Sequence, residues 1–170
     1  MVLGSTVYFY RGFIGQRGPV YTYEQKRDLA PILELFKTDT YWLLANPGTD
    51  PAFLITHKTP SEHDPFYFGK LHVKVLREDE KFIGFVAYYK KTFREGFLLF
   101  VAIKPEFRGK RYAQTLVQYA VDELRRLGAA RVSLVTRTDN VRAQALYNRL
   151  GFTETQRDEG FVYYIKSLKD

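Results

Sequence analysis

Hydrophobic and polar positions form their clearest pattern between residues 97 and 128. Seven consecutive apolar residues, 97–103, are rich in β-branched and aromatic side chains, which predicts a buried strand ending before Pro105. Beyond a short basic turn, apolar residues recur every three or four positions, which predicts an amphipathic helix from near Gly109 to Gly128. The recurring residues are Ala113, Leu116, Val117, Ala120, Leu124 and Leu127.

The remaining segments read as short strands and two further helices. Strands are predicted at residues 7–14, 20–24, 71–77, 82–91, 130–136, 152–155 and 161–166. Asp28 and Asp139 are predicted N-caps of the other two helices, with Pro31 tolerated in the first turn of the former. Charged residues 78–81 predict a hairpin, and a turn at 92–96 extends it to three antiparallel strands. Prolines interrupt residues 38–70, where at most one short helix is predicted, within 51–57.

Composition limits the classes of protein and site. With 170 residues, 45% of them hydrophobic, the chain can form one compact domain, which we place at residues 20–170. Residues 1–19 are expected to be an extension that could add a strand. The absence of cysteine excludes disulfides, thiolate catalysis and Cys-ligated zinc. The three histidines form no i, i+4 pair, so no metal is expected.

Charge and hydropathy indicate a soluble protein that attracts anions. No targeting segment and no run of about eighteen apolar residues occurs, so a cytoplasmic location is expected. The net charge of +7 favours anionic partners. The basic residues are dispersed and no RNA-recognition aromatic signature is present, which argues against nucleic acid.

The basic turn after residue 103 is a candidate phosphate site. A helix that follows a strand in this way directs its first free N–H groups, and the positive end of its dipole, at the turn. Arg108, Lys110 and Arg111 lie in the same turn. A phosphate is the natural occupant. Taken alone, the segment is equally compatible with an ordinary connection whose basic side chains are solvated.

A second motif favours the phosphate reading. Asn140, Ala143, Tyr147 and Gly151-Phe152 follow one another at intervals of 3, 4 and 4 residues. This stretch resembles the N-x-x-A-x-x-x-Y-x-x-x-G-F helix of the GNAT superfamily of acyl-CoA-dependent N-acetyltransferases. The basic turn resembles that family's pyrophosphate motif, R-G-x-G-x-G/A. It reads Arg108-Gly109-Lys110-Arg111-Tyr112-Ala113.

One residue departs from the family pattern, because Arg111 stands where a second glycine is usual. Its side chain could obstruct the pyrophosphate, or its guanidinium could add a phosphate contact. The resemblance covers roughly residues 20–166. It implies an α+β fold, with a mixed, mostly antiparallel twisted sheet of about six or seven strands and helices on both faces.

The resemblance also implies the chemistry. Acetyl-CoA would donate its acetyl group directly to a primary amine, without a metal. Cofactor contacts are expected from Val101, Ile103, Arg108, Gly109, Lys110, Arg111, Tyr112, Ala113, Asn140 and Tyr147. Tyr147 would also act as the general acid that protonates the departing thiolate, a step only modestly uphill for a phenol of pKa about 10 and a thiol of about 8.5. The alternative for Tyr147 is a core aromatic on the apolar face of its helix.

A general base and the acceptor are harder to assign. Residues 97–103 contain no carboxylate, so Glu95 at the strand's edge is the predicted base, with His72 and Glu80 as alternatives. A structural or surface role competes for each of the three. A protein N-terminus, a lysine, a polyamine or a small amine would all serve as acceptor.

Aromatic residues in the irregular region could shape an acceptor pocket, although for each one alone a core position is preferred. They are Tyr41, Trp42, Phe53, Phe66, Tyr67 and Phe68. Two other functions stay open: an acyl-CoA-binding module without turnover and, less favoured, a nucleic-acid-binding protein. Exposed edge strands would also permit a homodimer.

Overall fold

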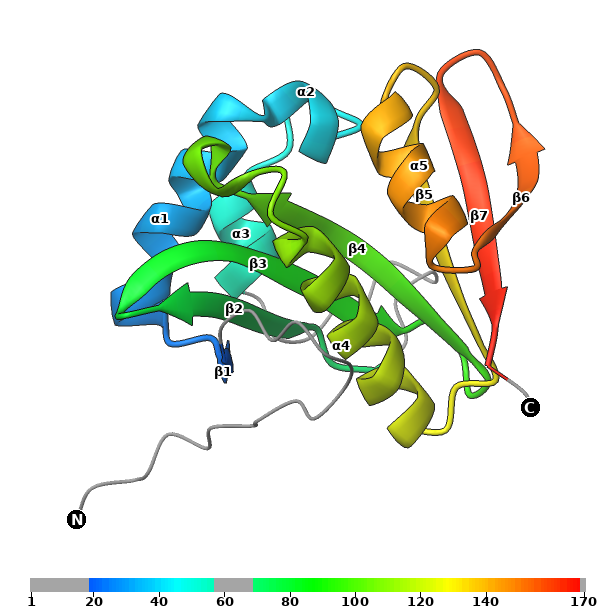
Figure 1. Cartoon of the computed structure of the whole chain (residues 1–170), viewed down its shortest axis with the longest axis horizontal. Coiled ribbons are helices and arrows are strands. Elements are labelled where there is room, and N and C mark those ends of the chain that lie inside the picture. The colour runs from blue at the N-terminus through cyan, green and yellow to red at the C-terminus, as the bar shows by residue number, and fades with distance from the viewer. Residues whose placement is uncertain (1–18, 57–68, 169–170) are drawn as a thin grey trace. The chain divides into compact units, whose positions relative to one another are not determined.

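The fold is α+β, as predicted (Figure 1). The computed structural model describes residues 19–56 and 69–168, so the predicted strand at 7–14 and residues 66–68 lie outside it. The strands are β1 Val20–Thr22, β2 His72–Glu78, β3 Lys81–Lys90, β4 Glu95–Ile103, β5 Arg131–Arg137, β6 Thr153–Arg157 and β7 Phe161–Ser167. The helices are α1 Gln25–Thr38, α2 Thr40–Leu43, α3 Pro51–Thr56, the 3-10 turn η1 Pro105–Phe107, α4 Tyr112–Arg126 and α5 Val141–Arg149.

The strands are hydrogen-bonded in the order β1-β2-β3-β4-β5-β7-β6. β1 pairs with β2, β5 with β7, and β6 with β7 in antiparallel fashion, whereas β4 and β5 are parallel. The parallel pairing runs from Glu95 opposite Arg131 to Leu98 opposite Leu134. β4 continues for five residues past its last pair with β5, to Ile103. The predicted mixed, mostly antiparallel sheet is confirmed.

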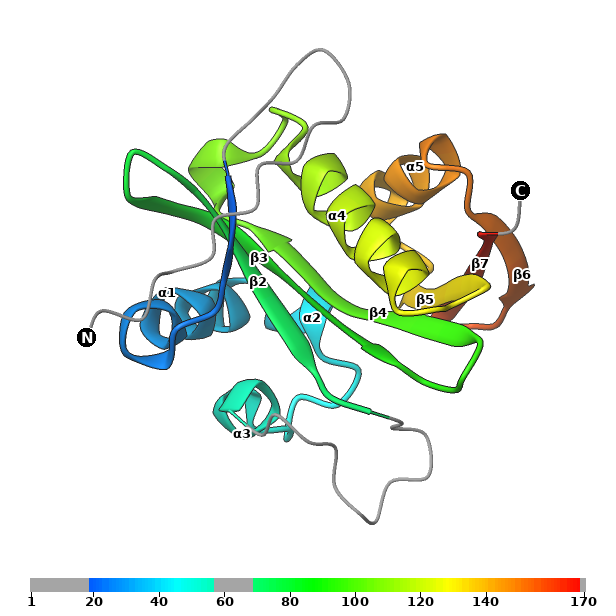
Figure 2. The same ribbon diagram turned by 90° about the horizontal axis from the view of Figure 1, so that it is seen from below.

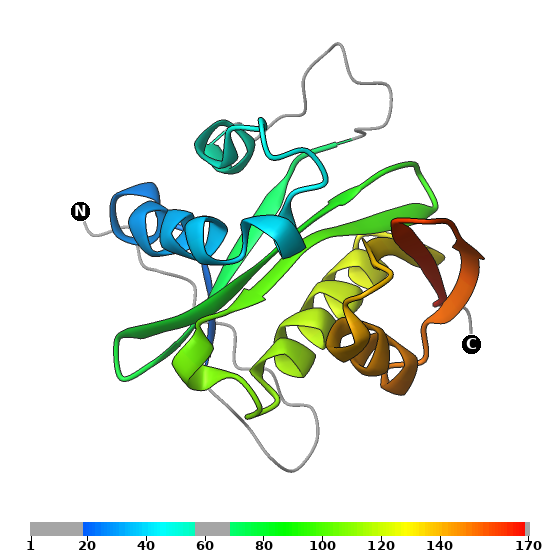
Figure 3. The same ribbon diagram turned by 90° about the horizontal axis from the view of Figure 1, so that it is seen from above.

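The described residues form two compact units, the first consisting of 19–56, 73–86 and 100–119. In this first unit, the ring of Phe36 on α1 lies 5.8 Å from that of Phe85 on β3 and 5.0 Å from that of Phe100 on β4. Figures 2 and 3 show α1 on one face of these strands and the beginning of α4 on the other. Because both faces are covered, β3 is buried at every position from 82 to 86 and its sequence does not alternate.

The second unit consists of residues 69–72, 87–99 and 120–168. Figure 1 shows α5 lying over β5 and β7. Strand lysines satisfy the carbonyls at the ends of both helices in this unit: Lys90 Nζ donates to Leu127 O at 2.8 Å, and Lys166 Nζ donates to Leu150 O at 2.7 Å. The predicted helix stop at Gly128 is confirmed, since this residue follows α4 with a φ of 87°.

The beginning of α1 differs from the prediction. Its N-cap is Glu24, so the helix starts three residues before Asp28. Asp28 instead accepts the Glu24 N–H at 2.8 Å from inside the first turn, and its carboxylate is paired with Arg77. The helix therefore reaches further back, and Pro31 lies at its seventh position rather than in its first turn, where it removes one intrahelical hydrogen bond.

The other two predicted helix starts also shift. α4 begins at Tyr112 rather than near Gly109, because Gly109 and Arg111 have left-handed φ values of 81° and 64° that no right-handed helix contains. The N-cap of α5 is Asn140 rather than Asp139, and its side chain accepts the Ala143 N–H at 3.1 Å. Asp and Asn cap helices about equally well, so adjacent residues of these types leave the start undecided by one position.

The hairpin between β2 and β3 turns on two residues in the left-handed region, Asp79 at a φ of 45° and Glu80 at 63°. Such two-residue turns favour Asn-Gly, because a β-carbon costs roughly 1–2 kcal/mol there. We expect Asp79→Asn combined with Glu80→Gly to stabilise the fold by about 1 kcal/mol, raising the melting temperature by roughly 2–4 °C. Thermal unfolding measures this. Glu159→Gly, in the exposed turn between β6 and β7, is the control and should give no gain; an equal gain there would contradict the explanation.

Candidate active site

The loop between β4 and α4 is held by side-chain hydrogen bonds within the first unit. Arg108 Nε donates to the Ile103 carbonyl at 2.9 Å, and Arg108 Nη2 forms an ion pair with Asp39 Oδ2. At the other end of the loop, the Tyr112 hydroxyl donates to Glu78 Oε2 at 2.6 Å. These contacts fix both ends of the loop.

Positive charge and the N–H groups that begin α4 meet at this loop. Lys110 and Arg111 are exposed, and Gly109 and Arg111 place the backbone in the left-handed conformation that lets the chain enter α4. The first N–H groups of a fifteen-residue helix have no intrahelical acceptor and lie at its positive end. This combination is suited to an anion such as a pyrophosphate.

The last residues of β4 approach β3 very closely. Val101 is half-buried and Ile103 is buried, while the next residue, Lys104, donates its N–H to Ile83 O at 2.9 Å. A β-carbon on Gly84 would lie only 2.3 Å from the Ala102 carbonyl oxygen. Glycine at position 84 is therefore what lets the end of β4 take this path.

Asn140 and Tyr147 lie on one helix of the second unit. The Asn140 side-chain oxygen is used as the N-cap of α5, which leaves its amide group as the donor for any cofactor contact. Tyr147 is 8% exposed, and its ring lies 5.8 Å from Phe152 and 5.9 Å from Tyr164. Burial raises the pKa of Tyr147 to about 12, so the phenol is fully protonated at neutral pH.

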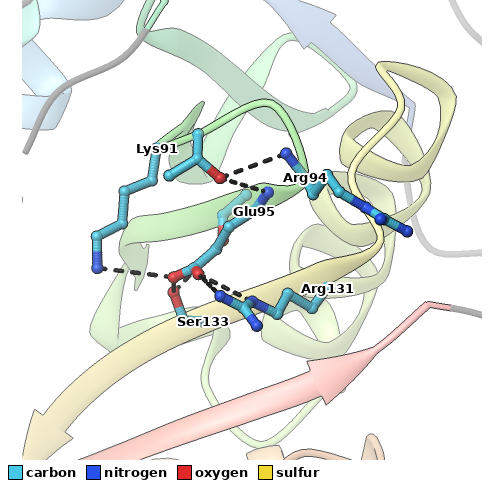
Figure 4. A network of polar contacts seen from close by, with 7 residues as sticks. Lys91, Arg94, Glu95, Arg131 and Ser133 are labelled. Atoms are coloured by element: carbon cyan, nitrogen blue, oxygen red, sulfur yellow. Dashed lines mark hydrogen bonds and ion pairs between the residues drawn. The ribbon is translucent and has the colours of Figure 1, made fainter.

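Glu95 lies at the opposite end of β4 from Ile103, in a polar network of the second unit (Figure 4). Its carboxylate accepts hydrogen bonds from Arg131 Nε at 2.9 Å and Ser133 Oγ at 2.7 Å, and Lys91 Nζ is 3.6 Å away. Burial alone would raise the pKa of Glu95, but the bonds from Ser133 and Arg131 and the nearby positive charges leave that pKa lowered. These contacts favour a structural role, and the base role stays a prediction.

We expect Glu95→Gln to destabilise the fold by about 2 kcal/mol at pH 7, because it removes charge-assisted hydrogen bonds in a nearly buried site. Since the folded pKa lies below the ordinary value of 4.5, the carboxylate stabilises the fold above that pH and loses this effect as the pH falls through the folded pKa. Denaturant unfolding of both proteins should therefore show the difference shrinking in acid. A difference independent of pH would contradict this; a loss of turnover of 10²-fold or more would instead support the base role.

Two carboxylates of the loop region were not identified from the sequence. Asp39 and Glu78 lie 69 and 34 residues from their partners Arg108 and Tyr112, and neither is part of a recognisable motif. Three aromatics for which a core position was preferred are instead about half exposed. They are Tyr41 at 51%, Trp42 at 45% and Phe53 at 50%.

The predicted site residues divide between the two units. The first unit brings together Val101, Ile103 and residues 108–113, and the second contains Glu95, Asn140 and Tyr147. No group of three or more His, Asp or Glu residues suited to a metal ion occurs in residues 19–56 and 69–168. Within the same ranges, no helix is both long and apolar enough to cross a bilayer.

The two motifs that resemble the GNAT superfamily thus lie on a strand, basic loop and helix and on an Asn-capped helix carrying a buried tyrosine, as the resemblance implies. Residues 29–152 match the model of the acetyltransferase (GNAT) family, and the chain belongs to that family.

Individual proteins agree with this assignment. N-alpha-acetyltransferase 30 of Schizosaccharomyces pombe is 33% identical over 87 residues, which cover 49% of this chain and 58% of that protein. The crystal structure of the Escherichia coli ribosomal-protein-S18-alanine N-acetyltransferase is similar with a TM-score of 0.67 at 19% identity, covering 89% of this chain and 94% of that one. A GNAT family acetyltransferase from Elizabethkingia anophelis, with acetyl-CoA bound, has a TM-score of 0.54 at 12% identity and covers 58% and 76%. The match thus spans little more than half the length of the yeast relative.

Proposed function

We propose that this chain is an acetyl-CoA-dependent N-acetyltransferase whose acceptor is the α-amino group at the N-terminus of a protein. The observation that carries the proposal is the loop 108–113 at the start of α4, bonded at both ends, within a chain that belongs to the GNAT family. Its similarity to a named N-alpha-acetyltransferase supports the acceptor class. An acetyl-CoA donor also favours the cytoplasm as the place of action.

Cofactor binding would use the loop and the end of β4. The Arg108 N–H donates to the Pro105 carbonyl at 3.2 Å, so backbone N–H groups of residues 109–113 would hold the pyrophosphate, helped by the exposed charges of Lys110 and Arg111. Residues 99–103 of β4 lie beyond its pairing with β5, so main-chain groups of Val101 and Ile103 would bind the acyl carbonyl. Asn140 would contribute its amide N–H groups to the pantetheine arm.

Transfer would then proceed directly. The neutral amine attacks the thioester carbonyl carbon, the carbonyl oxygen gains charge that backbone N–H groups stabilise, and the carbon–sulfur bond breaks. The departing thiolate takes the proton of Tyr147, and the amine gives its own proton to a base or to water. A phenol of pKa about 12 is a weaker acid than an ordinary tyrosine, so proton transfer to the thiolate is more uphill than predicted for a pKa of about 10.

Arg111 is expected to combine strain with a useful charge. Its left-handed φ of 64° costs roughly 1–2 kcal/mol for a residue with a β-carbon, which explains why glycine is usual at this position. We expect Arg111→Gly to stabilise the cofactor-free protein by up to about 1 kcal/mol and to weaken acetyl-CoA binding, because a phosphate contact is lost. Thermal unfolding and calorimetric titration measure the two effects. Tighter binding in the variant would show that the side chain obstructs the cofactor.

Two peptides distinguish the acceptor classes. The first has a free N-terminus and no lysine, and the second has the same sequence with a blocked N-terminus and one internal lysine. After incubation with acetyl-CoA, mass spectrometry should find the acetyl group on the first peptide only. Acetylation of the lysine peptide alone would contradict the proposed acceptor, and acetyl-CoA binding without transfer to any amine would indicate a binding module.

The half-exposed aromatics Tyr41, Trp42 and Phe53 would offer apolar contacts to the acceptor's first side chains. Homodimer formation stays a prediction. Among the strands within residues 19–56 and 69–168, β1 and β6 lie at the two edges of the sheet, and every residue of β6 is exposed, so β6 would be the pairing strand.

A further inference from the structure

The Arg108 side chain does not point its charge freely at the cofactor loop. Its guanidinium is divided between the carbonyl of Ile103, 2.9 Å from Nε, and the carboxylate of Asp39, paired with Nη2. The Asp39 side chain is 12% exposed and that of Arg108 is 33% exposed, so solvent only partly screens the ion pair. The carboxylate offsets part of the guanidinium's positive charge, and two of its N–H donors are already engaged.

Asp39 stands where α1 ends and α2 begins. Its N–H donates to the carbonyl of Leu35, in the last turn of α1, at 2.9 Å. Its own carbonyl accepts the N–H groups of Trp42 at 2.9 Å and Leu43 at 3.0 Å, in α2. Its backbone thus joins two helices while its side chain is bound to Arg108. One residue therefore connects the α1–α2 junction to the loop that follows β4.

We propose that Arg108 and Asp39 form a positioning pair, and that Arg108 is not a phosphate ligand. The pair fixes the Ile103 carbonyl, at the end of the strand that would hold the acyl group, relative to the α1–α2 junction and the exposed aromatics of α2. This inference rests on the proposed acetyl-CoA function, since it assigns how that same site is kept in shape.

Whether Asp39→Asn strengthens or weakens acetyl-CoA binding decides between a positioning role for Arg108 and direct phosphate binding. If Arg108 is a phosphate ligand, removing its competing carboxylate frees the guanidinium, so Asp39→Asn should tighten acetyl-CoA binding while Arg108→Ala weakens it. If the two residues position the site, both changes act in the same direction. We expect each to lower kcat/KM by roughly 10-fold or more, as misplacement of reacting groups by about 1 Å can cost 10²-fold.

The experiment measures acetyl-CoA affinity by calorimetry and kcat and KM with the free N-terminal peptide, at a temperature where every variant is folded. The variants are Asp39→Asn, Arg108→Ala and the double mutant. Glu34→Gln is the charge control, because it removes one negative charge from α1 at an exposed side chain that pairs with Lys37. The double mutant should be no worse than either single change, because the two residues act as a unit.

Several outcomes would contradict the proposed positioning role of Arg108 and Asp39. Tighter acetyl-CoA binding in Asp39→Asn but not in Glu34→Gln would identify Arg108 as a phosphate ligand. Additive losses in the double mutant would show independent roles, and a lower melting temperature with unchanged kcat and KM would show a purely structural contact. If wild type neither binds acetyl-CoA nor acetylates peptide, the proposed function fails instead, while non-additive melting temperatures would still detect the pair.

Discussion

Replacing Tyr147 by phenylalanine is expected to reduce kcat by about 10²–10⁴-fold, the range that a positioned general acid contributes. The substitution removes the hydroxyl and leaves the ring, which packs against Phe152 and Tyr164. Acetyl-CoA affinity should change much less than kcat, because the lost interaction forms as the thiolate leaves. Steady-state kinetics with the free N-terminal peptide measure both constants.

Tyr164→Phe is the matched control. It is a second buried tyrosine, 2% exposed, that contacts Tyr147 and has no role in the proposed chemistry. It should retain kcat within a few-fold. An equal loss in both variants, or full activity in Tyr147→Phe, would contradict the general-acid role.

Tyr147 should also affect stability in alkali. Its folded pKa of about 12 lies above the ordinary value of 10, so the buried phenol stabilises the fold fully below pH 10 and loses this effect as the pH rises toward 12. This difference in pKa corresponds to about 3 kcal/mol in the free energy of unfolding. Tyr147→Phe should therefore show a smaller loss of stability than wild type over that range.

Arg77→Met should cause the largest loss of stability, about 3–5 kcal/mol, because the carboxylate of Asp28 loses its buried cationic partner and keeps only the contact with the exposed Arg27. The Asp28 side chain is fully buried and that of Arg77 is 5% exposed. Denaturant unfolding at neutral pH measures the effect. Changing Asp28 to Asn in the same protein removes the buried charge and keeps a side-chain oxygen that can accept the Glu24 N–H. This second change should therefore restore part of the lost stability.

Arg27→Met provides the control, since Arg27 approaches the same carboxylate at 3.4 Å but is 39% exposed. Exposed ion pairs contribute about 0–1 kcal/mol, so its loss should be small. Comparable losses in Arg27→Met and Arg77→Met would mean that burial of the pair is not the cause.

Local patterns predicted the elements that carry the site. The apolar run at 97–103 and the periodic residues after it correctly located β4 and α4, because strand burial and helix amphipathicity are written into neighbouring residues. The departure of Arg111 from the glycine pattern also had structural meaning, since its φ of 64° is the conformation for which glycine is favoured.

Interactions between distant residues could not be predicted in this way. The partners of Arg108 and Tyr112 come from the α1–α2 junction and from β2, and no local pattern marks Asp39 or Glu78 as their acceptors. Asp28 shows the same limit, because it has the sequence properties of an N-cap but serves as the buried partner of Arg77. The half-exposed aromatics of α2 and α3 were misjudged because aromatic residues are common in cores, and their sequence context carries no periodicity.

Every proposed step depends on acetyl-CoA, so calorimetric titration of the purified chain with this cofactor is the decisive measurement. We expect one binding site per chain, with weaker binding of a ligand that lacks the pyrophosphate. We also expect weaker binding when Lys110 and Arg111 are both replaced by alanine. No heat of binding and no thermal stabilisation at millimolar acetyl-CoA would contradict the proposed function.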